Sequence, residues 1–278
     1  MKKWIAVLCI LLAAAALLPG AGFGEGAPAV PEAEDVTLRL PDKVLMTWFD
    51  NTMFVGDSQL AKFRNYVKKQ WKEKDWFFSN VDFRVENSYK FRFVAYRTIP
   101  SGEMKYAHLH DAGQKVTLFT IAGKVRPARI FILAGINDAL TTDYKNENGV
   151  ERAMRYVRGG TELIREASPE TEIYFITQMP VTKSFVQGSN GSKAVTERWN
   201  AINEAIQAES GELGITLVDL AYGLKDEDGL LPTAYCADGL CHLNDAGYEI
   251  FAQELLDFVQ AEYEAGRWVP AGFGSGNE

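Results

Sequence analysis

The chain has 278 residues, of which 47% are hydrophobic and 24% are charged, and its formal net charge at pH 7 is −8. The hydrophobic content is sufficient for one large core, and the negative charge argues against a general attraction to nucleic acid or anionic lipid. The sequence shows no internal repeat and no linker that would divide it, so we expect one main domain.

The first residues are typical of a secretory signal peptide. Lys2 and Lys3 precede an apolar run from Trp4 to Leu18, and small and turn-forming residues follow it. We expect cleavage near Gly24, which would make the mature protein secreted or extracytoplasmic. An uncleaved membrane anchor is the alternative, but the run is shorter than the roughly 20 residues of a spanning helix. No later segment is apolar enough to span a membrane, so we expect no stable membrane span after cleavage.

We divide the sequence into four parts on the basis of composition. Residues 1–24 form the signal peptide, and residues 25–40, rich in Gly, Ala, Pro and Glu, form a flexible lead-in. Residues 41–265 form the folded domain. Residues 266–278 form a frayed tail.

Within the domain, short apolar runs alternate with longer stretches of helical period, which indicates strand–helix–strand units and a parallel sheet. Strands are predicted at 52–55, 82–86, 128–133, 172–177 and 216–219. Three amphipathic helices are predicted from apolar stripes that would pack on the sheet: Val150, Met154, Val157 and Ile164; Val195, Trp199, Ile202 and Ile206; and Tyr248, Phe251, Leu255 and Val259. Asn244 is the expected cap of the last helix.

Polar residues follow each predicted strand. In an open parallel sheet, ligands bind in the crevice beyond the carboxyl ends of the strands. We therefore expect these residues to meet at one edge of the sheet: Ser58, Asn87, Ser88, Gly135, Asn137, Gln178 and the 238–242 loop.

Ser58 is the candidate nucleophile, because it lies where the first predicted strand gives way to a helix. A serine hydroxyl needs a base within hydrogen-bond reach and a third group that orients the base. His242 is the best base, since the other two histidines, His108 and His110, have no partner motif. Asp238, in the same loop as His242, is placed to orient the imidazole and to stabilise the imidazolium.

Three motifs in chain order resemble those of the GDSL, or SGNH, hydrolase family, over roughly residues 45 to 262. They are Gly56-Asp57-Ser58-Gln59-Leu60, Gly135-Ile136-Asn137-Asp138 and Asp238-Gly239-Leu240-Cys241-His242. The resemblance implies a three-layer α/β/α fold with a central, mostly parallel five-stranded sheet, similar to flavodoxin. It also implies a serine ester hydrolase that forms an acyl-enzyme and needs no cofactor.

An oxyanion formed by attack on an acyl carbon requires preorganised donors. The side-chain amide of Asn137 and the backbone N–H of Ser58 are candidates. The resemblance assigns a third donor to a glycine after the second strand, but residues 85–90 read Val-Glu-Asn-Ser-Tyr-Lys and contain no glycine. We expect the N–H of Ser88 or a neighbour to replace it. Asp57 and Asp138 are expected to tie their turns by hydrogen bonds to nearby backbone.

The spacing of the third motif also departs from the family, which usually places two residues between the acid and the histidine. Three residues separate Asp238 from His242. If the extra residue moves Asp238 out of range, Asp219 at the end of the last strand is the substitute. Cys236 and Cys241 lie in the same region, and in an exported chain such a pair favours a disulfide over two free, partly buried thiols.

The sequence thus predicts an exported serine ester hydrolase that removes acyl groups from carbohydrate or lipid esters, with a small-molecule or polysaccharide ester as substrate. An acyltransferase to glycan hydroxyls and a catalytically inactive glycan-binding protein of the same fold are the alternatives. We expect no metal site, because the histidines and cysteines lack metal-ligand spacing. No nucleic-acid partner is expected.

Overall fold

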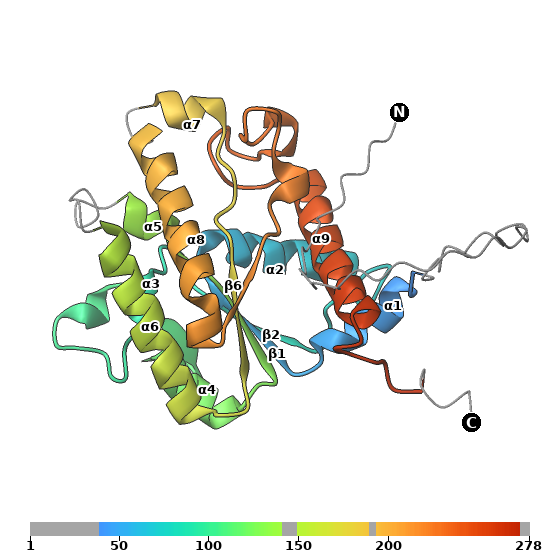
Figure 1. The fold of residues 1–278 in the computed structure, drawn as a ribbon, viewed down its shortest axis with the longest axis horizontal. Coiled ribbons are helices and arrows are strands. Elements are labelled where there is room, and N and C mark those ends of the chain that lie inside the picture. Colours follow the sequence, from blue (N-terminus) through green and yellow to red (C-terminus); the bar gives the residue numbers. More distant parts are fainter. Residues whose placement is uncertain (1–38, 141–148, 189–192, 273–278) are drawn as a thin grey trace, which may run out of the picture. The chain divides into compact units, whose positions relative to one another are not determined.

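The computed structural model describes residues 39–140, 149–188 and 193–272 (Figure 1). The expected signal peptide, residues 1–24, lies outside the described residues, as do nearly all of the lead-in and the last part of the tail. Within the described ranges, no helix has the length and apolar composition required to cross a membrane.

Five parallel strands form the central sheet in the order β2-β1-β5-β6-β7. They are β1 (Thr52–Gly56), β2 (Val81–Val85), β5 (Arg129–Leu133), β6 (Glu172–Ile176) and β7 (Thr216–Val218). Every predicted strand is confirmed, and the strand order is that of flavodoxin-like doubly wound sheets. Gly56 at the end of β1 pairs with Val85 and with Leu133, so the carboxyl ends of three adjacent strands lie level.

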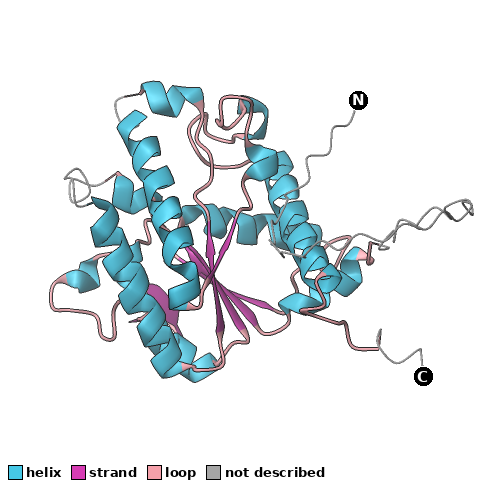
Figure 2. Cartoon of the chain, in the orientation of Figure 1, coloured by secondary structure: helices cyan, strands magenta, loops and turns pink. Residues whose placement is uncertain are grey.

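Helices cover both faces of the sheet, which confirms the three-layer α/β/α fold (Figures 1 and 2). One core lies between the sheet and the helices α1 (Asp42–Leu45), α2 (Ser58–Gln70) and α9 (Asp245–Glu264). The other core lies beneath α3 (Phe91–Val94), α4 (Leu118–Val125), α6 (Gly149–Ala167) and α8 (Lys193–Leu213). The three predicted amphipathic helices are α6, α8 and α9.

A ladder of aromatic rings holds α2 and α9 on their face of the sheet. The rings of Phe54 and Phe131 stack across β1 and β5 with centroids 5.0 Å apart, and those of Phe131 and Tyr174 stack at 4.6 Å. Phe63 of α2 and Phe251 of α9 meet edge to face at 4.8 Å. Each such pair contributes about 0.5–1.5 kcal/mol beyond its area burial. Phe63 also contacts Phe54 of β1, with centroids 6.3 Å apart, so α2 packs against the strand that precedes it.

Several short elements were not predicted from the sequence, because three to five residues are too few to show a period. A two-stranded antiparallel sheet joins β3 (Leu109–Asp111) to β4 (Gln114–Val116) through Ala112 and Gly113, whose φ values are 48° and 81°. Short helices α5 (Ile136–Ala139) and α7 (Lys183–Gln187) follow β5 and β6. The 3-10 turns are η1 (Met46–Phe49), η2 (Glu103–Lys105), η4 (Tyr222–Leu224) and η5 (Thr233–Tyr235).

Candidate active site

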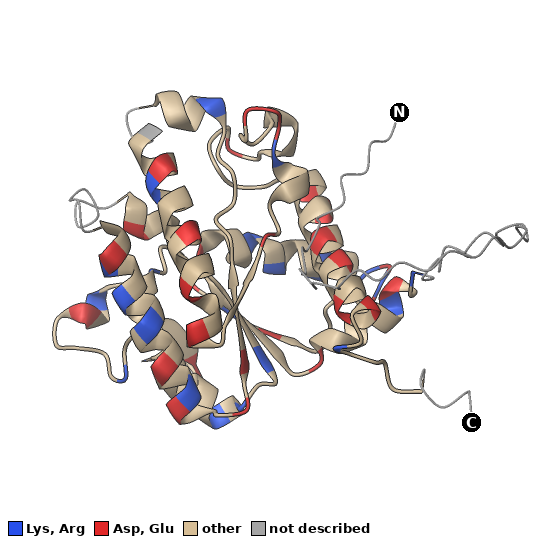
Figure 3. Ribbon diagram, in the orientation of Figure 1, with Lys and Arg blue, Asp and Glu red and all other residues tan. Residues whose placement is uncertain are grey.

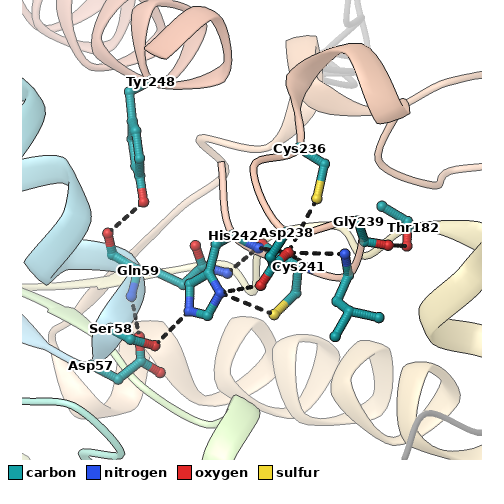
Figure 4. A network of polar contacts seen from close by, with 11 residues as sticks. Asp57, Ser58, Gln59, Thr182, Cys236, Asp238, Gly239, Cys241, His242 and Tyr248 are labelled. Carbon is teal, nitrogen blue, oxygen red and sulfur yellow. Dashed lines mark hydrogen bonds and ion pairs between the residues drawn. The ribbon is translucent and has the colours of Figure 1, made fainter. Parts of the chain in front are cut away.

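Ser58 is the first residue of α2, directly beyond the end of β1. Gly56 permits this tight exit, because a Cβ at that position would lie 2.3 Å from the carbonyl oxygen of Leu133. Asp57 then caps the helix, and its Oδ1 accepts the backbone N–H of Gln59 at 2.9 Å. The turn thus presents the Ser58 hydroxyl at the carboxyl edge of the sheet (Figure 4).

Ser58, His242 and Asp238 form a continuous hydrogen-bonded chain (Figure 4). Ser58 Oγ lies 2.9 Å from His242 Nε2, and His242 Nδ1 lies 2.5 Å from Asp238 Oδ2. The side chain of His242 remains 22% exposed, so a bound molecule has access to it. In this arrangement His242 Nε2 is placed to accept the serine proton while Asp238 holds the Nδ1–H tautomer.

The three-residue spacing between Asp238 and His242 is accommodated by a tight loop around the carboxylate. Asp238 Oδ1 accepts the backbone N–H groups of Leu240, Cys241 and His242 at 2.9, 3.0 and 3.2 Å. Gly239 adopts a φ of +74°, which favours glycine. Burial of Asp238 opposes its ionisation, but the hydrogen bonds from His242 and the three N–H groups outweigh burial and hold its pKa well below the usual range.

Asp219, the substitute acid, is engaged elsewhere. Its carboxylate accepts the Thr177 hydroxyl at 2.7 Å and the Ala221 N–H at 3.0 Å, and it lies 3.4 Å from Lys225 Nζ. The structure therefore places Asp238, and not Asp219, beside His242.

Three residues outside the predicted site anchor the 238–242 loop. Gln59 Nε2 donates to the Cys241 carbonyl at 2.6 Å, and the Tyr248 hydroxyl donates to the Gln59 carbonyl at 2.8 Å. Thr182 donates its hydroxyl to the Gly239 carbonyl at 2.7 Å and its N–H to the Leu240 carbonyl at 2.8 Å. Tyr248 belongs to a predicted apolar stripe. Its hydroxyl group was the only feature of the sequence that could have indicated this hydrogen bond.

Asn137 lies in α5 and connects the turns on either side of it. Its Nδ2 donates to Asp57 Oδ2 at 3.1 Å and to the Tyr89 carbonyl at 3.3 Å. Asp57 and Tyr89 are the chain neighbours of Ser58 and Ser88, so the three predicted oxyanion donors come from turns that meet. Among the described residues, the backbone N–H of Ser58 has no hydrogen-bond acceptor, as is usual in the first turn of a helix.

Asp57 is buried, with only 1% of its surface exposed. Burial raises its pKa to about 7, and the nearby Asp138 carboxylate adds to the rise, while the Gln59 N–H and the Asn137 amide oppose it. Asp57 thus ties its own turn, as predicted, and also holds the Asn137 amide. Asp138 was predicted to bond to backbone near it in the sequence, but its Oδ2 accepts the backbone N–H of Phe91, a residue far from it in the sequence, at 2.9 Å.

Ser88 is the residue that we predicted, together with its neighbours, to supply the third oxyanion donor, and its backbone conformation is unusual for a serine. Its φ is +62°, in the left-handed region that favours glycine. Gly135, in the second motif, also has a positive φ of +122°, and a Cβ there would lie 2.6 Å from Phe91 Cε2. Ser88 thus adopts a conformation that favours glycine, at a cost of about 1–2 kcal/mol in backbone strain.

The expected disulfide is not formed, because Cys236 and Cys241 are both free thiols. Each sulfur faces a different polar partner. Cys236 Sγ donates to Asp238 Oδ1 at 3.4 Å, and Cys241 Sγ lies 3.9 Å from His242 Nδ1. The hydrogen bonds around Asp238 and the 59–241 contact hold the loop without a covalent bridge.

Asp238, Cys241 and His242 are the described residues whose ligand atoms gather closely enough to hold a metal ion, within 4.8 Å of one another. Their chemistry favours the hydrogen-bonded cluster. The Asp238 oxygens already accept from His242 and three backbone N–H groups. Burial raises the pKa of the Cys241 thiol to about 12, so the thiolate that a metal prefers is disfavoured.

Gln178 and the remaining two histidines contact other parts of the fold. The Gln178 amide donates to the Ala134 carbonyl between β5 and α5. His108 is buried against Phe93 and bonds to the Glu103 carbonyl at 3.0 Å, whereas His110 is exposed beside Glu86. Neither histidine takes part in the Ser58–His242 chain.

The model of one protein family covers the residues that form this site. The model of the GDSL-like Lipase/Acylhydrolase family matches residues 54–250, more than half of the chain. No curated protein sequence matches it.

Solved structures similar to this chain share its fold at low sequence identity. A GDSL-like lipase from Bacteroides thetaiotaomicron is 15% identical, with a TM-score of 0.52 over 76% of this chain and 87% of its own. A structure assigned as an acylhydrolase of Bacteroides fragilis is 15% identical, with a TM-score of 0.53 over 76% and 86%. One assigned as a GDSL-like lipase of Parabacteroides merdae is 16% identical, with a TM-score of 0.53 over 76% and 94%. With the match over residues 54–250, the chain belongs to the GDSL-like lipase/acylhydrolase family.

Proposed function

We propose that the protein is a serine ester hydrolase that works through an acyl-enzyme. The observation that carries this proposal is the 2.9 Å contact between Ser58 Oγ and His242 Nε2, aligned by the 2.5 Å contact of His242 Nδ1 with Asp238. This geometry favours a catalytic protein over an inactive glycan-binding one, because Ser58, His242 and Asp238 each have the hydrogen-bond partner that catalysis requires.

In the first half-reaction, Ser58 Oγ attacks the acyl carbon and its proton passes to His242 Nε2. Collapse of the tetrahedral intermediate breaks the ester C–O bond, and His242 returns that proton to the departing alkoxide, which leaves as an alcohol. Water then attacks the acyl-enzyme and gives its proton to His242. The second collapse releases a carboxylic acid and restores the serine hydroxyl.

The developing oxyanion would lie among the backbone N–H of Ser58, the N–H of Ser88 and the Asn137 amide. In the free protein Asn137 Nδ2 donates to Asp57 and to the Tyr89 carbonyl. The Asn137 amide is therefore held close to Ser58 and Ser88 before any substrate binds. Both hydrogens of this amide already have acceptors, so one of them must turn from Asp57 or from the Tyr89 carbonyl to the oxyanion as it forms.

We place the activity outside the cytoplasm, on carbohydrate or lipid esters. The support is the basic and apolar segment at residues 2–18, which is typical of export. An exported esterase meets cell-wall and environmental glycans, so O-acetylated sugars are the first substrates to examine.

Release of acid from small aryl acetates by the purified protein tests the proposal. Ser58→Ala should reduce kcat/KM by roughly 10⁴-fold or more while the circular dichroism spectrum stays unchanged. Labelling by a fluorophosphonate should occur in the wild type and be absent in Ser58→Ala. Equal activity of the two proteins would overturn the assignment of Ser58. Addition of a glycan acceptor separates hydrolysis from acyl transfer, since only a transferase would convert the acceptor to its ester.

A further inference from the structure

A groove of about 670 Å³ runs between α2 and the residues that flank the 238–242 loop. One wall comes from α2 and includes Lys62, Asn65 and Lys69. The opposite wall includes Leu243 and Asp245 at the start of α9. The groove therefore lies between the two segments that supply Ser58 and His242, and it adjoins these two residues without being lined by either.

The α2 wall continues the helix face that begins with Ser58. Residues three and four apart on a helix lie on one face, with Cβ atoms roughly 5–6 Å apart. Lys62 is four residues after Ser58, and Asn65 and Lys69 follow at intervals of three and four. Lys62 is thus one helical turn from the proposed nucleophile on the same face.

Basic charge on this helix is not balanced by acidic residues of the helix itself. α2 contains four basic residues and no acidic residue, in a chain whose net charge is −8: Lys62, Arg64, Lys68 and Lys69. Figure 3 shows basic residues on α2 and several acidic residues on α9.

The acidic groups near the groove lie toward its far end. Asp245 pairs with Lys69 Nζ at 2.8 Å. Burial, together with Glu249 and Asp245, raises the pKa of Tyr66 to about 12, which places both carboxylates near that ring. Lys62 has no ion-pair partner within the described residues, and its side chain is half-buried. Its ammonium is also close enough to lower the pKa of the Cys241 thiol, against the larger effect of burial.

We infer that the groove takes an anionic ester, with Lys62 binding the negative group of the substrate while Ser58 attacks its acyl carbon. The anion lies about one helical turn from the reacting carbon. A carboxylate or a phosphate on the sugar that carries the acyl group meets this requirement. This inference rests on the proposed esterase function and adds the charge of its substrate.

Three acetylated sugars of similar size provide the test. They are O-acetylated glucuronic acid, its neutral methyl ester and an O-acetylated hexose phosphate, and the readout is kcat/KM for acetate release. A charge-assisted hydrogen bond predicts about a tenfold or greater preference for the anionic esters over the neutral one. The preference should shrink as ionic strength rises, because the groove is open to solvent.

Lys62→Gln should bring the ratio of anionic to neutral kcat/KM close to one, and Lys62→Glu should bring it below one. Lys68→Gln is the matched control, since Lys68 is exposed, lies on the same helix and does not line the groove. This control makes the same change in net charge and should keep the wild-type ratio.

The outcomes separate the two proposals. Preference for the carboxylate or for the phosphate supports the inference and identifies the anion. Equal kcat/KM for all three esters, or an equal loss of preference in Lys62→Gln and Lys68→Gln, overturns the inference and leaves the esterase function standing. No release of acetate from any of the three sugars overturns the inference, and it overturns the esterase function as well only if small aryl acetates are not hydrolysed either.

Discussion

Gln59 joins the helix that carries Ser58 to the loop that carries His242. Its side-chain amide donates to the Cys241 carbonyl at 2.6 Å, so the residue after the proposed nucleophile holds the residue before the proposed base. Gln59 is almost fully buried, with 4% of its surface exposed. The contact therefore sets the distance between Ser58 and His242 from inside the protein.

Gln59→Leu should lower kcat by about ten- to a hundredfold with little change in KM, because small misplacements of catalytic groups slow the chemical step. It should also cost about 1–3 kcal/mol of stability, since a buried carbonyl loses its donor. Steady-state kinetics and urea unfolding measure the two effects. Leu255→Ala, in the core of α9, is the control for destabilisation and should leave kcat unchanged at 25 °C while costing about 2–5 kcal/mol. An equal fall of kcat in both variants would contradict a positioning role for Gln59.

Asp238→Asn should lower kcat by roughly 10³- to 10⁴-fold and keep most of the stability. Asn retains an oxygen for the N–H groups of Leu240, Cys241 and His242, but its amide nitrogen faces His242 Nδ1 and imposes the wrong tautomer. Asp238→Ala should be destabilised as well, because all three N–H groups lose their acceptor. Kinetics and thermal unfolding of the pair test this, and a fully active Asp238→Asn would remove Asp238 from the mechanism.

Asp57 should make the protein less stable as pH rises toward neutrality. Burial raises its pKa from 3.8 in the unfolded chain to about 7 in the fold, so the folded state binds the proton more tightly. The stability that it contributes is fully present below pH 3.8 and is lost as pH rises through about 7. Urea unfolding of wild type and Asp57→Asn should diverge in favour of the variant by about 1.4 kcal/mol per pH unit within this window, and then level off.

Asp75→Asn, an exposed site, is the control for the loss of one charge and should run parallel to wild type across the same pH range. If Asp57→Asn also runs parallel, the raised pKa is wrong.

Ser88→Gly should stabilise the protein by up to about 1.5 kcal/mol. Glycine removes the strain of a φ of +62°, which is worth roughly 1–2 kcal/mol. The greater conformational entropy of glycine in the unfolded chain opposes this gain by about 0.5–1 kcal/mol. Asn87→Gly, at the preceding exposed position without a positive φ, should instead destabilise. Thermal unfolding measures both changes, and a lower melting temperature for Ser88→Gly would exclude the left-handed conformation.

Both Cys236 and Cys241 should react with a thiol reagent when the protein is denatured without reductant. In the folded protein, Cys241 should react far more slowly than in the denatured protein, since burial raises the pKa of its thiol to about 12 and leaves little thiolate. Cys236→Ser and Cys241→Ser assign the two rates. Absence of both thiols after denaturation, with a mass lower by two hydrogens, would show that a disulfide forms.

The strands and long helices could be predicted from sequence because hydrophobic periodicity reports directly on which face is buried. Thr52–Gly56 and Asp245–Glu264 are long enough for that signal. Asn244 could be predicted as a helix cap because asparagine is a preferred residue at that position. The β3–β4 hairpin and α5 are too short to carry a period. Ser58, Asn137 and His242 are predicted to meet at one edge of the sheet because they come after the carboxyl ends of predicted parallel strands.

The sequence by itself determined a parallel sheet and the residue types available at its carboxyl edge, because the hydrophobic pattern and the residues that follow each strand can be read along the chain. Only the tertiary structure decided which carboxylate is hydrogen-bonded to His242, and that Cys236 and Cys241 are free thiols. Those choices depend on how a loop folds around Asp238, and on contacts from Gln59 and Thr182 that lie far from it in sequence. Hydrogen bonds between distant segments leave no periodic trace, so they become visible only once the chain is folded.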